Sequence, residues 1–301
     1  MINKYNLIYI RITFKIVIHI HLLHETLIII RSNLVYDYAK FSFNYFINMF
    51  LLPLIYISFN YYNKFVIKQN INKYNLAFYT CFYGSSNNEA FMIPSLPSEN
   101  YDCYYFSNNK NLLEKINETK WIGIFDDKLV TDNLVESCFY GKQVKVIPET
   151  FDILNKYDYT CFLDSKLPKV SEAFVENFIY TYFILQDYAL LLREHVFIQG
   201  NIWNEFNVSM HQARYSIHKD QIKTYIDKQI KDGFSEKTPK HCQCGFLIRN
   251  MKHPEMKKLN NTWYSHIQEC GIQDQISFFF VKQLFEKDIL PFKEVPFIID
   301  S

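Results

Sequence analysis

The sequence is poor in glycine, with 7 glycines among 301 residues. It contains neither a Gly-x-Gly-x-x-Gly motif nor the glycine-rich loop that ends in Gly-Lys-Ser or Gly-Lys-Thr. Both motifs let the backbone approach nucleotide phosphates closely. Their absence argues against a dinucleotide-binding Rossmann protein and against a P-loop nucleotidase.

The chain also lacks a regular cysteine pattern and an excess of charge of either sign. Its 7 cysteines are an odd number at irregular spacings. This does not fit a disulfide framework and favours reduced thiols. The net charge is +1 and 21% of the residues are charged, so nothing indicates a nucleic-acid-binding surface.

Aromatic residues, in contrast, are abundant at 18% of the chain. Together with many Ile, Asn and Lys residues, this is typical of an AT-rich coding sequence. We therefore do not interpret aromatic stripes as stacking sites.

The first 73 residues are predicted to form a hydrophobic extension and linker. Residues 8–20 alternate with period two, which is typical of a strand. Residues 41–63 carry no charge and are long enough to cross a bilayer as a helix, which takes about 20 residues. We interpret 41–63 as a membrane anchor or interfacial segment, with a buried helix or a non-native start of the protein as alternatives. The domain boundary is placed between 1–73 and 74–301.

From residue 74 onward, short strands alternating with helices predict an α/β domain with a mainly parallel sheet. The predicted strands are 76–82, 102–106, 121–125, 144–147, 159–163 and 246–250. The predicted helices are 111–116, 151–156, 170–193, 217–230, 257–270 and 274–285.

The strand 159–163 is the centre of the functional prediction, because it leads into Asp164 and Lys166. Ligands of open α/β sheets lie at the C-terminal ends of the strands. A carboxylate there can hold a metal ion or accept hydrogen bonds from a ribose or sugar hydroxyl. A strand followed by a polar turn is the alternative. Asp274, at the start of a predicted helix, is interpreted either as its N-cap or as a ligand contact.

The order of these features resembles a family of glycosyltransferases that includes plant mucilage-related and turgor-regulation proteins, together with bacterial and viral members. The resemblance extends from about Leu76 to Val281, and 274–278 is its most specific motif. The segments that carry it are Tyr79–Gly84, Tyr105–Asn108, Lys145 with Pro148, Tyr157–Lys166, His195, Glu205, Gln229 with Gly233, Ile248-Arg249, Trp263 and Asp274–Phe278.

The resemblance implies a GT-A-like single domain that transfers a sugar from a nucleotide-sugar donor to a glycan or protein acceptor in glycan biosynthesis. It implies catalytic roles for His195, Glu205 and Asp274 in acceptor activation or sugar binding. The implied donor-binding residues are Tyr83, Asp164, Lys166, Arg214, Arg249 and Gln275.

A divalent metal, Mn²⁺ or Mg²⁺, would be bound at Asp164. The motif is Asp-Ser-Lys rather than Asp-x-Asp, so Lys166 puts a positive charge where a second carboxylate would stand. The metal requirement is therefore left open. The compartment is left open as well, between the cytoplasm, a membrane surface and a Golgi- or ER-type lumen.

Three departures from the family pattern support an alternative, a catalytically inactive module that binds glycans or another protein. Val196 stands in place of Pro, Gln273 in place of Arg, and Asn108 in place of Asp. A membrane-embedded structural protein organised by 41–63 is a second alternative. A zinc module at 241–244 is a third, although one His and two Cys are an incomplete ligand set.

Overall fold

The computed structural model describes residues 74–85 and 91–298, which belong to a compact unit spanning 73–301. The predicted strand at 8–20 and the apolar segment 41–63 lie outside the described residues. Within the described residues, no helix combines the length and the apolar character that a bilayer crossing requires. Membrane association through 41–63 therefore stays a prediction.

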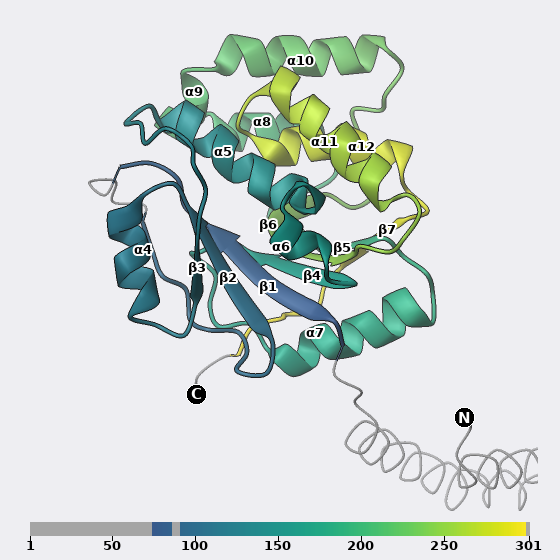
Figure 1. The fold of residues 1–301 in the computed structure, drawn as a ribbon. Helices are drawn as coiled ribbons and strands as arrows, with labels where there is room; N and C mark the ends of the chain where they lie inside the picture. Colours follow the sequence, from purple (N-terminus) through teal and green to yellow (C-terminus); the bar gives the residue numbers. More distant parts are fainter. Residues whose placement is uncertain (1–73, 86–90, 299–301) are drawn as a thin grey trace, which may run out of the picture. The chain divides into compact units, whose positions relative to one another are not determined.

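In the described chain, seven strands form one sheet in the order β3-β2-β1-β4-β6-β5-β7 (Figure 1). Strand β6 runs antiparallel to both of its neighbours, and the other pairings are parallel. The α/β class with a mainly parallel sheet is confirmed. The strands are β1 Leu76–Cys81, β2 Asp102–Ser107, β3 Ile122–Phe125, β4 Tyr159–Leu163, β5 Leu190–Glu194, β6 Cys242–Asn250 and β7 Ile289–Phe292.

Helices flank the sheet on both faces (Figure 1). The α-helices of the described residues are α4 Lys110–Asn117, α5 Leu134–Val146, α6 Asp152–Asn155, α7 Glu172–Phe178, α8 Ile202–Ser209, α9 Ala213–Ser216, α10 Lys219–Lys231, α11 Met256–Cys270 and α12 Asp274–Leu284. A short 3-10 helix, η2 Pro148–Thr150, follows α5, and a π-helical segment, η3 Ile179–Ile184, continues α7.

The core follows the alternation of side chains along the strands. Tyr79 of β1 points into a cluster formed with helices α11 and α12, where it lies with Trp263 and Phe278. Its neighbour Phe78 points to the other face and packs in the cluster that includes Phe178 of α7. The sheet is thus buried on both faces, as the nearly uninterrupted apolar strands predict.

Two predicted elements are wrong. The segment 144–147 is not a strand, because it continues helix α5, which begins after an N-cap in which Asn133 Oδ1 accepts from the backbone N–H groups of Val135 and Glu136. The predicted helix 170–193 ends early. Asp187 has a φ of 57°, which no helix accommodates, and the chain then enters the buried strand β5.

The antiparallel strand β6 assembles the edge of the sheet that matters for function. The backbone N–H of Asp164, just after β4, donates to the carbonyl of Gly245 at 2.8 Å. On the other side of β6, the N–H of His195 donates to the carbonyl of His241 at 2.8 Å. These bonds hold Asp164 and His195 on either side of the start of β6.

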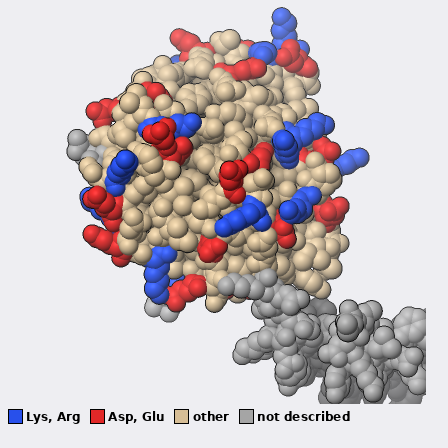
Figure 2. Space-filling view, viewed as in Figure 1, with Lys and Arg blue, Asp and Glu red and all other residues tan. Residues whose placement is uncertain are grey.

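Figure 2 shows that basic and acidic side chains are interspersed over the face in view, with broad uncharged areas between them. No single-sign patch of charge dominates this face.

Candidate active site

A cavity of about 500 Å³ lies at this edge of the sheet. Its walls come from the ends of β4 and β5, the start of β6, helices α8 and α9, the end of α5 and the start of α12. Six of the residues predicted from the sequence line the cavity: Asp164, His195, Glu205, Arg214, Asp274 and Gln275. The fold thus collects side chains that are separated by up to 111 residues along the chain.

Asp164 is exposed at the cavity, and its carboxylate makes no hydrogen bond or ion pair with the described residues. Its position is fixed through the backbone, by the N–H bond to Gly245 and by its carbonyl, which accepts from the N–H of Leu167 at 3.0 Å. A carboxylate held by its backbone and open on its side chain is suited to accept hydrogen bonds from a ligand.

Asp274 is buried and bound by two lysines of helix α5. Its Oδ2 lies 2.8 Å from Lys142 Nζ and 2.5 Å from Lys145 Nζ. Burial alone would raise the pKa of this carboxyl, but the two ammonium groups lower it further, and the resulting pKa is about 2. The pKa of Lys142 is lowered by burial and raised more strongly by Asp274, with a net increase. Asp274 is therefore ionised at neutral pH and is a weak base.

The interpretation of Asp274 as an N-cap is wrong. Gln273 occupies the cap of α12, and its side chain accepts from the N–H of Gln275 at 3.4 Å. Asp274 is the first helical residue, where a negative charge is also favourable.

Glu205 is buried and has both carboxylate oxygens occupied. Its Oε2 lies 2.8 Å from His241 Nε2. Its Oε1 accepts from the side-chain amides of Gln275 at 2.9 Å and Gln273 at 3.1 Å, and from the hydroxyl of Ser209 at 3.2 Å. Glu205 thus orients the amide of Gln275 at the cavity wall, leaving little capacity for a proton-transfer role of its own.

His195 is half-buried, and its ring stacks on His241 with the centroids 5.5 Å apart. Burial lowers the pKa of His195, Glu205 opposes this effect and His241 adds to it, so that the pKa lies below 6.5. Its Nδ1 accepts from the backbone N–H groups of Phe197 and Ile198 at 3.2 and 2.9 Å. The proton of the neutral ring therefore resides on Nε2, and the imidazole presents a hydrogen-bond donor.

Two arginines add positive charge to the cavity wall. Arg214 donates to Gln212 Oε1 at 2.9 Å, and its guanidinium lies over the ring of Tyr215. The Nε of Arg193 is buried and has no hydrogen-bond partner among the described residues. A bound anion could use these donors.

Three predicted donor-binding residues do not line this cavity. Arg249 is fully buried and donates to Tyr79 Oη at 3.0 Å, to the carbonyl of Lys145 at 2.8 Å and to an Asn260 oxygen at 3.3 Å. The hydroxyl of Tyr83 donates to Asp126 at 2.7 Å. Lys166 is exposed outside the cavity. The direct diphosphate contact predicted for Arg249 is corrected, because its side chain points into the core.

The sequence prediction missed the lysine pair and the partner of Glu205. Lys142 and Lys145 are three residues apart, a spacing that places both on one helix face, but a strand was predicted over the second of them. His241 was considered as part of an incomplete zinc motif, whereas it pairs with Glu205.

No cluster of three or more His, Cys, Asp or Glu side chains is placed to hold a metal ion in the described part of the chain. At the cavity, Asp164 is the one carboxylate of the described residues that has no protein partner, and it lies among several cations. This donor set fits a divalent cation only if the ligand supplies most of the oxygens.

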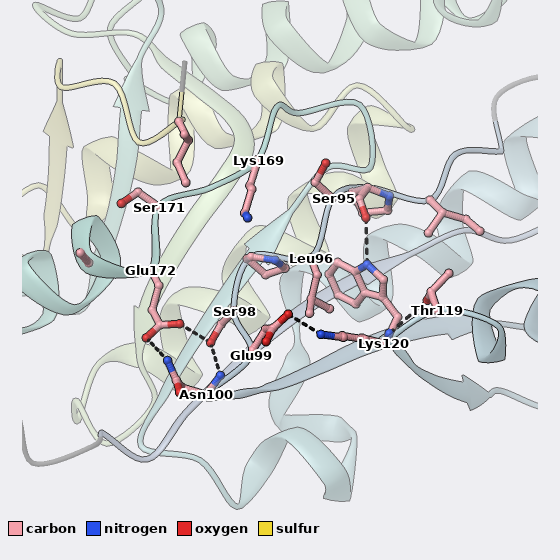
Figure 3. A pocket seen from close by; sticks show the side chains of 16 residues that line it. Ser95, Leu96, Ser98, Glu99, Asn100, Thr119, Lys120, Lys169, Ser171 and Glu172 are labelled. Carbon is pink, nitrogen blue, oxygen red and sulfur yellow. Dashed lines mark hydrogen bonds and ion pairs between the residues drawn. The ribbon is translucent and has the colours of Figure 1, made fainter. Parts of the chain in front are cut away.

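A larger cavity, of about 730 Å³, lies near the opposite ends of β2 and β3 and contains none of the predicted site residues (Figure 3). Its polar groups bond mainly to one another. Glu172 accepts from Ser98 Oγ at 2.5 Å and from Asn100 Nδ2 at 2.8 Å, and Lys120 pairs with Glu99. The smaller cavity is therefore the better candidate for chemistry.

Neither a protein-family model nor a curated protein sequence matches this chain. Three solved structures are similar to it. Mouse xyloside xylosyltransferase 1 is 13% identical with a TM-score of 0.41, over 73% of this chain and 84% of that one. The mannosyltransferase Ktr4p from S. cerevisiae is 9% identical with a TM-score of 0.36, over 69% and 66%. The bifunctional glycosyltransferase WbbM is 10% identical with a TM-score of 0.39, over 74% and 40%. All three are glycosyltransferases, and the described chain has the GT-A-like α/β fold class predicted from its sequence.

Proposed function

We propose that the chain is a glycosyltransferase that moves a sugar from a nucleotide-sugar donor to a glycan or protein acceptor. The observation that carries the proposal is the 500 Å³ cavity at the strand ends, which brings together six residues that were predicted independently from sequence motifs. Ligands of open α/β sheets bind at this edge.

The charges of the cavity suit the leaving group of such a reaction. Sugar transfer breaks the bond between the anomeric carbon and a diphosphate oxygen, and forms a bond from that carbon to an acceptor oxygen. The diphosphate gains negative charge as it leaves, and cationic side chains stabilise that charge. Arg193 and Arg214 line the cavity with donors for it.

The three carboxylates of the cavity have different roles in this proposal. Glu205 and Asp274 are occupied by protein donors and position the groups around them. Asp164 accepts from a hydroxyl of the donor or of the acceptor, because its oxygens have no partner among the described residues. His195 donates its Nε2 proton to a sugar or phosphate oxygen.

A divalent cation, Mn²⁺ or Mg²⁺, would be held by Asp164 together with phosphate oxygens, and would supply further neutralisation of the diphosphate. The cations of the cavity wall can supply part of that charge without it.

The test is equilibrium binding and turnover of a panel of nucleotide sugars by the full chain, with and without Mn²⁺. We expect one donor to bind saturably, and Asp164→Asn to weaken that binding at least tenfold while the fold is kept. Asp227→Asn, at an exposed lysine pair on α10, is the matched control and should bind as the wild type. Saturable binding that is equal in wild type and Asp164→Asn would remove Asp164 from the site.

An inactive module that binds glycans or protein is the second candidate. It is favoured by the occupied state of Glu205 and Asp274, and by Gln273, which stands in place of the family's Arg and donates to Glu205. Glycan binding without donor binding or turnover, by a folded chain, would support this candidate against the transferase.

A further inference from the structure

The lysine pair at Asp274 is not balanced in charge. Lys142 and Lys145 contribute two positive charges and Asp274 one negative charge, which leaves +1 (2 − 1). The side chains are 17%, 7% and 6% exposed, respectively. A net charge held with so little water around it is unfavourable unless a counter-charge is close.

The described residues at the cavity do not supply that counter-charge. Glu205 is engaged by His241 and by three other donors. Asp164 is matched in the cavity lining by Arg193 and Arg214. With Lys142, Lys145, Arg193 and Arg214 set against Asp164, Glu205 and Asp274, and with neutral histidines, the lining also sums to +1 (4 − 3).

The ammonium groups also have unused hydrogen-bond donors. Each carries three N–H donors, and each makes one contact, to the same Asp274 oxygen. Lys145 Nζ further lies 5.3 Å from the centroid of the Phe162 ring, which accepts no conventional hydrogen bond. Two donors on each lysine therefore remain for a ligand or water at the cavity.

We propose that Lys142 and Lys145 form an anion subsite that binds a carboxylate or phosphate group of the substrate. The inference rests on the proposed function and adds to it, because it assigns an acidic group of the substrate to these two residues. Charge-assisted bonds from two ammonium groups to one oxyanion are short and strong, and the bound anion brings the cluster from +1 to neutrality.

The anion has two chemical sources in a nucleotide-sugar reaction. One is the diphosphate of the donor, and the other is the carboxylate of a uronic acid. UDP-glucose and UDP-glucuronate have the same diphosphate and differ at C6, where the second has a carboxylate. Inorganic diphosphate and free glucuronate test each anion without the nucleotide.

The informative substitution is Lys142→Met. It leaves the 2.5 Å Lys145–Asp274 pair in place, so the buried carboxylate keeps a partner and the fold should survive. The cluster becomes neutral and loses its demand for an anion. Lys142→Arg keeps the charge and should keep binding. Lys228→Met removes a lysine from an exposed pair with Glu269 and is the matched control.

The four probes are titrated calorimetrically into the full chain and its three variants, after thermal unfolding has shown that each is folded. We expect Lys142→Met to weaken anion binding at least tenfold, with Lys142→Arg and Lys228→Met within about threefold of wild type. Equal losses for both nucleotide sugars and for diphosphate assign the subsite to the diphosphate. A loss confined to UDP-glucuronate and glucuronate assigns it to a sugar carboxylate.

Two outcomes separate this inference from the function. If the nucleotide sugars bind and Lys142→Met binds them as the wild type does, the subsite is refuted and the transferase stands. If diphosphate or glucuronate binds through Lys142 and no nucleotide sugar binds, the subsite stands and the transferase loses its support. If none of the four probes binds the folded wild type, the subsite is refuted as well.

Discussion

At the scale of single residues, the pH dependence of stability tests the ion pairs of Asp274. Its pKa falls from 3.8 to about 2 on folding. A depressed carboxyl pKa stabilises the folded state above the unfolded value, and this contribution disappears as pH falls through the folded value. A change of this size corresponds to roughly 2 kcal/mol.

We therefore expect Asp274→Asn to lower the free energy of unfolding by about 3 kcal/mol at pH 6, because two buried ammonium groups lose their partner. The deficit should shrink as pH falls from about 4 towards 2. Urea unfolding at a series of pH values measures it, with the exposed Asp227→Asn as control. A deficit that stays constant down to pH 2 would show that the ion pairs do not carry the effect.

His195 gives a second prediction at this scale. Its lowered pKa and its Nδ1 acceptor bonds make it a neutral donor through Nε2 above pH 6.5. Donor binding should therefore be flat in pH between about 7 and 8.5, apart from changes that His195→Gln also shows. Calorimetric titration across this range is the measurement. A step that is present in wild type and absent in His195→Gln would mean that the imidazole titrates in this range.

At the scale of elements, most strands and helices could be predicted from apolar periodicity, and the errors occurred where local pattern competes with the tertiary fold. Residues 190–193 are apolar enough for either a buried helix or a buried strand. What decides between them is the reversal at Asp187, whose φ of 57° ends the helical segment before β5. A left-handed backbone at an exposed Asp leaves little trace in the sequence.

Substitutions at Asp187 test whether this reversal sets up β5. Asn accepts a positive φ readily and Val does not. We expect Asp187→Asn to match the wild type in stability and Asp187→Val to lose roughly 1–2 kcal/mol. Thermal or urea unfolding of both variants provides the comparison. Equal stability of the two would mean that the backbone at 187 carries no such cost.

At the scale of the whole molecule, the site is assembled by topology that the sequence pattern does not contain. The strand after which Asp164 stands could be predicted, because ligand-binding residues follow buried strands in α/β sheets. That β6 runs antiparallel between β4 and β5 could not, since the alternation of side chains is the same in either direction. The pairing of Asp274 with lysines 129 and 132 residues earlier depends on that packing as well.

Arg249 is where this limit is most visible, and it gives the last prediction. Its guanidinium joins β6 to the hydroxyl of Tyr79 on β1, to the carbonyl of Lys145 in α5 and to Asn260 in α11. A lysine cannot reproduce this fork of donors. We expect Arg249→Lys to lower the free energy of unfolding by about 2–4 kcal/mol, because buried acceptors lose their partners.

The folded Arg249→Lys variant should bind inorganic diphosphate within about threefold of wild type, in contrast to Lys142→Met, if diphosphate is the anion of the lysine subsite. Urea unfolding and calorimetric titration of the same protein separate the two effects. Near wild-type stability combined with a loss of diphosphate binding confined to this variant would restore the direct donor contact predicted from the sequence. A loss of stability with binding retained would place Arg249 among the residues that hold the sheet, α5 and α11 together around the site.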